Sequence, residues 1–449
     1  MENLPELVIP ELECSNFQLT TGATSDYFLK SNALGFGTWA ASVGGGSSSF
    51  YDAVIPTDYA TLNEAISAGK KRIAIISNCN CSNVTLTSDL YIKMSTNTIL
   101  TVLNNVLFTI PNMAKYNIYI EGGEIKGSTN FSILDNYSPA LLHINNTKFN
   151  YQLITSVLTG NTDNLIMNNI KVYNRISSLS MGVSAFNNII IDNFDITENN
   201  GLYEFNILST TKNVHINNMR KSSFVPDGDA FNANLIYVRY AATIDNLIIT
   251  NSLLGNLLYD NFFSSVVKEK IILKNNTFYG ATVSILLQND SSICIISNNI
   301  HVNNDINSVI FITSLNTCKN LIINNNIVNR ISIGALYEYI SIDNNIINRN
   351  ILIFTVVSNV NINNNNIKCI SLIPSIGISM TAANSNFTIN GNIIAGDINI
   401  GATSQLILTN NRFVGLLSSL IGTVLATGNY TTAVLVGHLA LHPNSTGNI

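Results

Sequence analysis

The stretch Leu321-Ile-Ile-Asn-Asn325 decides the fold, because close copies of it recur along most of the chain. Apolar residues at its first and third positions put two side chains on one face of a strand, since successive side chains of a strand point to opposite faces. A polar pair, most often Asn-Asn, follows. The copies end at positions 122, 146, 169, 193, 218, 251, 275, 298, 325, 344, 364, 391 and 410, a mean spacing of 24 residues. Such a period indicates a stacked repeat.

The last residue of each copy, called the corner residue below, is expected to turn the chain through left-handed backbone geometry. Asn is the corner residue in eleven copies and Gly in two, and both residue types tolerate positive φ. An apolar residue usually follows three positions later, as Val328 does, although Lys221 and His301 depart from this rule. We therefore predict an all-β fold, a single-stranded right-handed parallel β-helix in which stacked Asn side chains hydrogen-bond as ladders.

Composition argues against several classes of function. Charged residues make up 11% of the 449 residues, hydrophobic residues 46%, and the net charge is −5. Nucleic-acid binding needs clustered Lys and Arg, which the sequence lacks. No apolar stretch approaches the roughly 20 residues of a membrane span, and residues 1–13 lack the regions of a secretory signal. We expect no membrane insertion, no metal and no cofactor. The six cysteines are expected to be packing thiols, because they form no disulfide framework.

The pattern divides the chain into four parts. Residues 1–43 form an N-terminal segment, 44–49 a Gly/Ser linker, 50–415 the β-helix, and 416–449 a C-terminal cap or oligomerisation segment. A short helix over 58–69 is predicted to cap the first rung, with Asp58 as its N-cap and Gly69 just past its end. An open solenoid end needs such a cover, because exposed strand edges promote aggregation.

Two stretches resemble known families. The capping helix, the strand Lys71-Arg-Ile-Ala-Ile-Ile76 and the Asn-cornered rungs look like the pectin-lyase-like superfamily, which includes pectate lyases, polygalacturonases and phage tailspikes. The segment from Thr20 to Trp39 is similar to one common in viral fibre proteins. The resemblance implies a spike or fibre of a phage or large DNA virus. It also implies a homotrimer on the virion surface, with residues 1–43 contacting other virion proteins.

No complete catalytic set is found in the sequence. Asn161-Thr-Asp163 matches one of four motifs typical of polygalacturonases, the other three are missing, and no Asp cluster like that of pectate lyases is present. His143 and His215 both occupy the outward position between two inward apolar residues. They lie about three rungs apart, which is too far for one metal site. The sequence therefore leans away from an enzyme.

The longest interval between corners, 33 residues from 218 to 251, marks the best candidate site. Long loops on a rigid scaffold often carry function, and carboxylates, Arg and Tyr suit recognition of sugar hydroxyls. A hydrolase would need two carboxylates across a groove, and Asp227 and Asp229 are the weak catalytic candidates. A solvated surface loop is the competing interpretation. The candidate glycan-binding residues are Asp227, Asp229, Arg239, Tyr240, Tyr259 and Asp260.

These observations favour a viral structural spike or fibre that attaches to a host-surface polysaccharide. Two alternatives stay open at this point. A polysaccharide depolymerase, either hydrolase or lyase, could use the same scaffold if a carboxylate pair faced one groove. A secreted cellular adhesin is the other alternative.

Overall fold

A computed structural model describes much of the chain, and every structural statement below refers to this described part. It comprises residues 27–31, 37–41, 50–104, 106–111, 114–127, 132–135, 140–150, 162–173, 179–181, 186–196, 205–207, 211–221, 234–238, 244–254, 256–259, 270–278, 282–287, 293–302, 309–314, 318–334, 337–354, 357–368, 376–380, 386–400, 405–414, 417–419, 423–431, 435–436 and 440–441. The chain separates into two compact units, Met1–Tyr51 and Asp52–Ile449, which are described one at a time.

The described residues of the first unit form an antiparallel strand pair. Strand β1 (Tyr27–Ser31) pairs with β2 (Gly37–Ala41), and Leu29 lies opposite Trp39. The only tryptophan of the chain is therefore part of a local hairpin.

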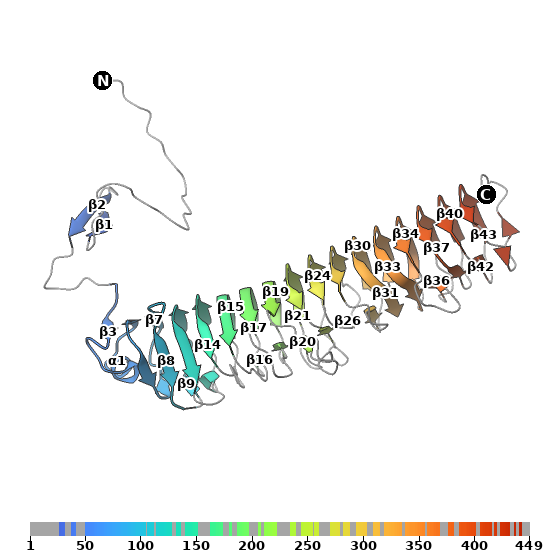
Figure 1. Ribbon diagram of the computed structural model, residues 1–449. Helices are drawn as coiled ribbons and strands as arrows, with labels where there is room; N and C mark the ends of the chain where they lie inside the picture. Colours follow the sequence, from blue (N-terminus) through green and yellow to red (C-terminus); the bar gives the residue numbers. More distant parts are fainter. Residues whose placement is uncertain are drawn as a thin grey trace, which may run out of the picture. The chain divides into compact units, whose positions relative to one another are not determined.

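The second unit is built from three sheets in which every assigned pairing is parallel (Figure 1). A small sheet contains β6 (Val84–Thr85), β9 (Val106–Thr109) and β12 (Ser132–Asp135). The first long sheet contains β3 (Ala53–Ile55), β4 (Arg72–Ile75), β5 (Cys79–Cys81), β7 (Leu90–Met94), β8 (Ile99–Val102), β10 (Asn117–Glu121), β11 (Glu124–Gly127), β13 (Leu141–Asn145), β14 (Lys148–Asn150), β15 (Thr162–Tyr173), β17 (Phe186–Ile196), β19 (Thr211–Lys221), β21 (Ile244–Thr250), β24 (Lys270–Lys274), β27 (Ile293–Ser297), β30 (Cys318–Asn324), β32 (Tyr337–Asp343), β34 (Val357–Asn363), β37 (Asn386–Asn390), β40 (Gln405–Thr409), β43 (Thr423–Thr427) and β46 (Ala440–Leu441). The second long sheet contains β16 (Leu179–Met181), β18 (Phe205–Ile207), β20 (Asn234–Val238), β22 (Leu253–Leu254), β23 (Asn256–Tyr259), β25 (Thr277–Phe278), β26 (Thr282–Leu287), β28 (Ile300–His301), β29 (Val309–Ser314), β31 (Ile327–Gly334), β33 (Ile346–Ile353), β35 (Asn366–Ile367), β36 (Ile376–Met380), β38 (Ile393–Ile394), β39 (Asp397–Ile400), β41 (Arg412–Phe413), β42 (Leu417–Ser419), β44 (Tyr430–Thr431) and β45 (Leu435–Val436).

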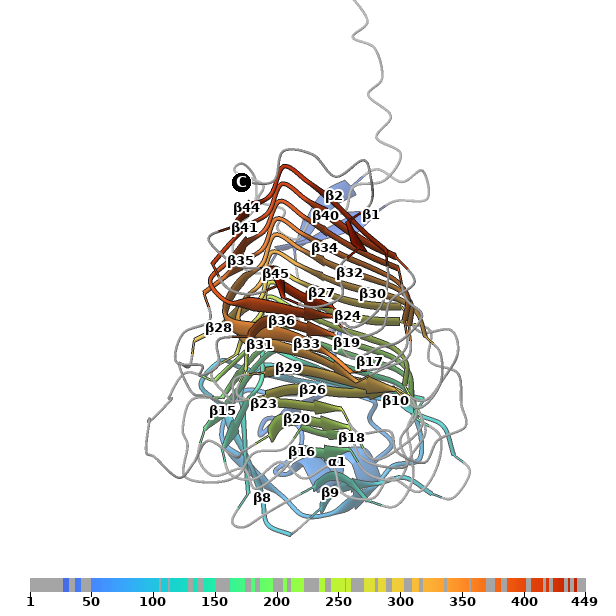
Figure 2. The ribbon, with the colours of Figure 1, turned by 90° about the vertical axis from the view of Figure 1, so that its right-hand side faces the viewer.

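This arrangement confirms the predicted parallel β-helix. Each strand pairs with the equivalent strand one rung away, as Leu321 of β30 does with Ile340 of β32. Figure 2 shows the strands of successive rungs stacked one behind another. Parallel strands need a crossover connection, and here each crossover is the rest of the rung.

The corner residues have the predicted left-handed backbone. All thirteen predicted corners have positive φ, between 52° and 57° at the Asn positions and 80° and 66° at Gly122 and Gly391. Gly428 adds a further corner with φ of 64°. At Gly391 a Cβ would also collide with Oδ1 of Asn364 in the preceding rung. Asn and Gly were therefore correctly interpreted as turn-forming residues.

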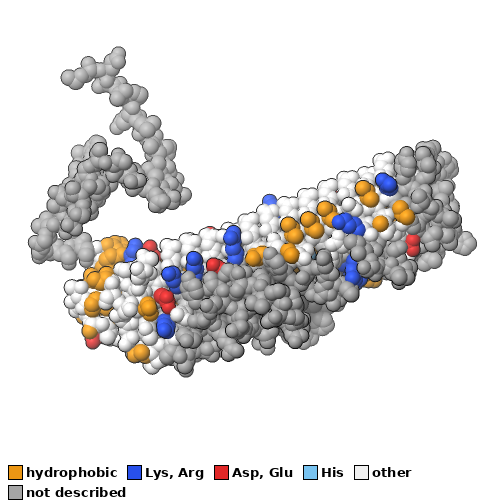
Figure 3. Space-filling view, viewed as in Figure 1, with side chains coloured by type: hydrophobic (Ala, Val, Ile, Leu, Met, Phe, Trp, Pro, Cys, Tyr) orange, Lys and Arg blue, Asp and Glu red, His pale blue; other side chains and the backbone are white. Residues whose placement is uncertain are grey.

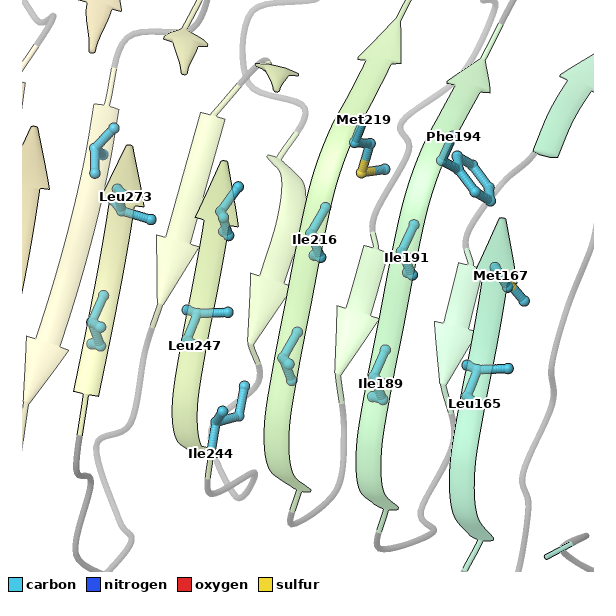
Figure 4. Packing of buried hydrophobic residues seen from close by; sticks show 14 of the residues in the cluster. Leu165, Met167, Ile189, Ile191, Phe194, Ile216, Met219, Ile244, Leu247 and Leu273 are labelled. Carbon is cyan, nitrogen blue, oxygen red and sulfur yellow. The ribbon is translucent and has the colours of Figure 1, made fainter. Parts of the chain in front are cut away.

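The interior is lined by the two apolar residues before each corner. Leu321 and Ile323 are both fully buried, and their equivalents before the other twelve predicted corners are at most 2% exposed. Figure 4 shows Ile189 and Ile191 of β17 beside Leu165 and Met167 of β15, with side chains in continuous rows. Burial of each such side chain contributes about 1.5–3 kcal/mol, so the rows hold neighbouring rungs in register.

The capping helix is shorter than predicted. Helix α1 spans Leu62–Ser67, and its N-cap is Thr61, whose side chain accepts a hydrogen bond from the backbone N–H of Glu64. The prediction of Asp58 as N-cap was wrong, because the Asp58 carboxylate instead accepts from the N–H of Val54. Gly69 does follow the helix with positive φ, and Leu62, Ala65 and Ile66 are buried.

Parallel pairing extends beyond residue 415. Strand β43 pairs with β40, β45 with β42, and β46 with β43. The sequence pattern is weak here because Ala426 replaces the usual large aliphatic residue and Gly428 replaces Asn at the corner. The described part of 416–449 therefore adds strands to the β-helix.

Candidate functional site

The predicted loop residues can be placed only in part. Asp227, Asp229, Arg239, Tyr240 and Asp260 lie outside the described residues. Tyr259 ends strand β23, in register with Val238 and Ile285. The prediction of a glycan site in this stretched rung therefore stays a prediction.

The described surface carries a column formed by the residue two positions after each corner. We call it the exposed column. In the first rungs it is charged, with in-register pairs linking Glu124, Lys148, Lys171, Asp195 and Arg220. In later rungs it is mostly aliphatic, with Ile300, Ile327, Ile346 and Ile393 each at least 37% exposed. Figure 3 shows a line of charged side chains giving way to hydrophobic ones along this face.

The charged part of the column contains a shallow hollow of about 260 Å³. Lys171, Asp195 and Arg220 project beside it from β15, β17 and β19, which run through their corners as single strands. Nε of Arg220 donates to Oδ1 of Asn218 at 2.7 Å, which orients the guanidinium group. Ile170 and Phe194 form the apolar part of the lining.

The electrostatics of the hollow favour an anionic ligand. It holds two cations and one carboxylate, and no ion pair within 4.0 Å joins Asp195 to Lys171 or Arg220 in the described residues. Oδ1 of Asp195 is buried and has no hydrogen-bond partner among the described residues. The hollow therefore offers two cationic donors and one carboxylate acceptor. Corner amides lie around it, including Asn193, whose Nδ2 donates to Oδ1 of Asn169 at 3.0 Å.

An aromatic column lies on the outer face of the first long sheet, and sequence reasoning missed it. Tyr91, Tyr119 and His143 are in register on β7, β10 and β13. Their ring centroids are 6.3 Å and 5.8 Å apart. Burial lowers the pKa of His143, and the nearby Glu121 carboxylate opposes that shift. The sequence does contain a signal for this column, because Tyr91, Tyr119 and His143 each lie between two inward-facing apolar residues of their strand.

The remaining site predictions concern histidines and metals. His143 and His215 are separated in the outward slot by Ile166 and Ile190, so they lie three rungs apart as predicted. In the described residues no group of three His, Cys, Asp or Glu side chains could hold a metal ion. The same residues contain no helix long and apolar enough to span a membrane.

Comparison with known proteins gives no family assignment. No protein-family model, curated protein or solved structure matches this chain.

Proposed function

We propose that this protein is a viral surface spike or fibre whose β-helix attaches to an acidic polysaccharide on a host surface. The observation that carries the binding part is the hollow at Lys171, Asp195 and Arg220. Its three charged groups stand on neighbouring strands about 4.8 Å apart, so a chain lying along the column can meet them in turn. The spike part rests on the sequence resemblance, as does display on the virion.

A rigid scaffold supports this function. The three strands are held by a buried apolar row and by Asn side chains that link one rung to the next. Little backbone ordering is then needed on binding, which preserves affinity. Cationic groups near an exposed surface also accelerate the approach of an anionic polymer, and salt screens that attraction.

The test is retention of the full chain by immobilised polygalacturonate and by a sulfated polysaccharide. Lys171→Ala with Arg220→Ala should weaken retention by about tenfold or more, and the loss should shrink at high salt. Lys212→Ala with Lys274→Ala is the matched control, because it removes two positive charges from exposed positions on β19 and β24 outside the hollow. Equal retention of the double variant and the wild type would contradict the proposal.

A polysaccharide depolymerase is the second candidate function, favoured by the long interval that contains Asp227 and Asp229. The hollow itself has one carboxylate in its lining, whereas glycoside hydrolysis ordinarily uses two. Product release from bacterial and algal polysaccharides separates the two functions. Oligosaccharides that disappear with Asp227→Ala or Asp229→Ala would place an active site in the stretched rung and replace the binding-only function.

The proposal includes a homotrimer. Three copies could pack through the aliphatic part of the exposed column, isoleucine against isoleucine, with the charged part that holds the hollow left open to solvent. Exposed apolar patches commonly mark such interfaces. Sedimentation equilibrium tests this: Ile327→Lys with Ile346→Lys should shift trimer to monomer. Lys274→Ala, outside the column, should not.

A further inference from the structure

We infer that the aromatic column Tyr91–Tyr119–His143, together with the polar groups beside it, is a second carbohydrate site that takes a neutral pyranose. The site lies on strands β7, β10 and β13, apart from the charged hollow on β15, β17 and β19. It does not depend on the proposed function.

The three rings form a continuous ridge. Tyr91 and Tyr119 are tilted by 43° with centroids 6.3 Å apart, and Tyr119 meets His143 edge-on at 5.8 Å. All three side chains are half-buried, so their inner parts pack together and their outer parts face solvent. The C–H face of a pyranose packs well against such rings, because an aromatic face is apolar and carries partial negative charge. Because the three residues lie in register on neighbouring strands, each ring is one rung further along the β-helix than the last.

The carboxylate of Glu121 and the ammonium group of Lys93 lie along one side of the ridge and are held by hydrogen bonding and an ion pair. Tyr91 Oη donates to Oε2 of Glu121 at 2.7 Å, and Nζ of Lys93 lies 3.4 Å from Oε1 of the same carboxylate. Lys93 and Glu121 sit two residues after Tyr91 and Tyr119, so they share the outward face. The carboxylate can accept from a sugar hydroxyl and the ammonium can donate to one.

The other side of the ridge also carries fixed polar groups. The backbone N–H of Asn117 donates to Oδ1 of Asp89 at 2.9 Å, and Nδ2 of Asn117 donates to Oδ2 at 3.2 Å. Hydroxyl-binding groups therefore flank the rings on both sides. That combination of an apolar face and polar edges matches the two kinds of surface that a pyranose presents.

The end of β7 leads into a polar hollow of about 640 Å³, lined by residues 76–78 and 95–98. Its side chains are Ser, Thr and Asn apart from Ile76, and none is charged. Ser95 lies four residues after Tyr91, roughly 13 Å along the strand. The ridge itself runs across the strands, so a branch or a bend of the polysaccharide at Tyr91 could reach this hollow, which again provides hydroxyl and amide partners.

The charge balance selects a neutral ligand. Lys93 is paired with Glu121, and Arg72 in the preceding rung is paired with Asp52 at 2.9 Å. Stacking platforms for single-stranded nucleic acid combine aromatic rings with a positively charged groove. Among the described residues beside this ridge, cations do not outnumber carboxylates. A neutral polysaccharide fits this site, because it binds to aromatic rings and hydrogen-bonding groups and needs no opposite charge from the protein.

The test is affinity gel electrophoresis of the full chain with a neutral glucan, a galactomannan, and polygalacturonate in separate gels. A neutral polymer should retard the wild type equally at low and high salt. Tyr119→Ala should raise the Kd for that polymer about tenfold, whereas Tyr119→Phe should keep most of the affinity. Tyr339→Ala is the matched control, a half-buried tyrosine on the distant strand β32.

The outcomes separate this site from the charged hollow. Loss of neutral-polymer binding by Tyr119→Ala, with a urea-unfolding midpoint equal to that of the wild type, supports the inference whether or not polygalacturonate is retained by the hollow. Unchanged binding of the variant, or no retardation of the wild type by either neutral polymer, overturns it. Preferential retardation by single-stranded oligonucleotides would overturn it too, because the ridge would then be a base-stacking platform.

Discussion

Asn365 donates both its backbone N–H and its side-chain Nδ2 to one oxygen, Oδ1 of Asn392 in the next rung, at 2.8 and 3.0 Å. The same Nδ2 donates to the carbonyl of Ile342 in the preceding rung at 2.7 Å. One side chain thus ties three rungs together. The arrangement repeats through the residue after each corner from Asn275 onward, and the ladder comprises Asn276, Asn299, Asn326, Asn345, Asn365, Asn392, Asn411 and Asn429, each at most 3% exposed.

Removing one member of this ladder should destabilise the protein strongly. Asn345→Ala leaves the N–H and Nδ2 of Asn326 without their acceptor and the carbonyl of Ile323 without its donor. Each unsatisfied buried group costs about 1–3 kcal/mol, so we expect a loss of at least about 3 kcal/mol. Urea unfolding followed by circular dichroism measures it. The exterior Asn361→Ala is the control, and similar midpoints for the two variants would show that the ladder adds little.

The corner positions should accept Gly and reject β-branched residues. Asn344 has φ of 57°, a region that costs most L-residues about 1–2 kcal/mol. Asn344→Gly should melt close to the wild type, whereas Asn344→Val should melt several degrees lower. Thermal unfolding of the two variants side by side checks this. A Val variant as stable as the Gly variant would mean that the corner backbone is not strained.

The repeat could be predicted from the sequence because its signal is local. The triplet Leu321-Ile-Ile followed by Asn predicts strand, face and turn within a few residues. The sequence could not tell apart the structural roles of Asn324, Asn325 and Asn326, because the three residues are identical. In the structure Asn324 is half-buried before the corner, Asn325 has positive φ at the corner, and Asn326 is buried in the ladder.

The candidate sites were harder to predict because they depend on register between rungs. Tyr91 and Tyr119 are 28 residues apart, and the first of these rungs turns at residues 95–98, none of which has the positive φ of a corner residue. Their alignment follows only from the pairing of β7 with β10. Likewise, Lys171, Asp195 and Arg220 look like scattered surface charges until the strands are aligned.

Acid should destabilise the protein through His301. Its ring is 7% exposed against Phe278, and burial lowers its pKa from 6.5 to about 4. Above pH 6.5 the ring is neutral in both folded and unfolded chains. As pH falls towards 4 the unfolded chain binds a proton that the folded one excludes, so stability falls, by on the order of 3 kcal/mol.

His301→Val, the residue type found in the same slot of the next rung at Val328, should flatten this pH dependence. The urea midpoint measured from pH 7 to pH 4 gives the comparison, with the exposed His215→Val as control. An unchanged pH profile in the His301 variant would assign the acid sensitivity to other groups.

The thiols near the capped end should be nearly inert. Cys79 and Cys81 are free, and burial raises their pKa to about 11 and about 12. The thiolate is the reactive form, so alkylation by iodoacetamide at pH 8 should be far slower than for a small-molecule thiol. Peptide mass mapping after timed alkylation reads each cysteine separately. Fast modification of Cys81 in the folded chain would mean that the first rungs open readily.

Asp195 should oppose binding of an acidic polysaccharide. Its carboxylate lies between Lys171 and Arg220 in the exposed column, and no ion pair with either offsets its charge within the described residues. At a solvent-accessible site its repulsion of an anionic ligand is worth up to about 1 kcal/mol. Asp195→Asn should therefore lower the Kd for polygalacturonate about two- to fivefold, and high salt should remove the gain.

Asp245→Asn on β21 makes the same charge change outside the hollow and should have little effect. If Asp195→Asn instead abolishes binding, the carboxylate accepts hydrogen bonds from the ligand, and hydroxyl recognition governs affinity in the hollow more than charge does.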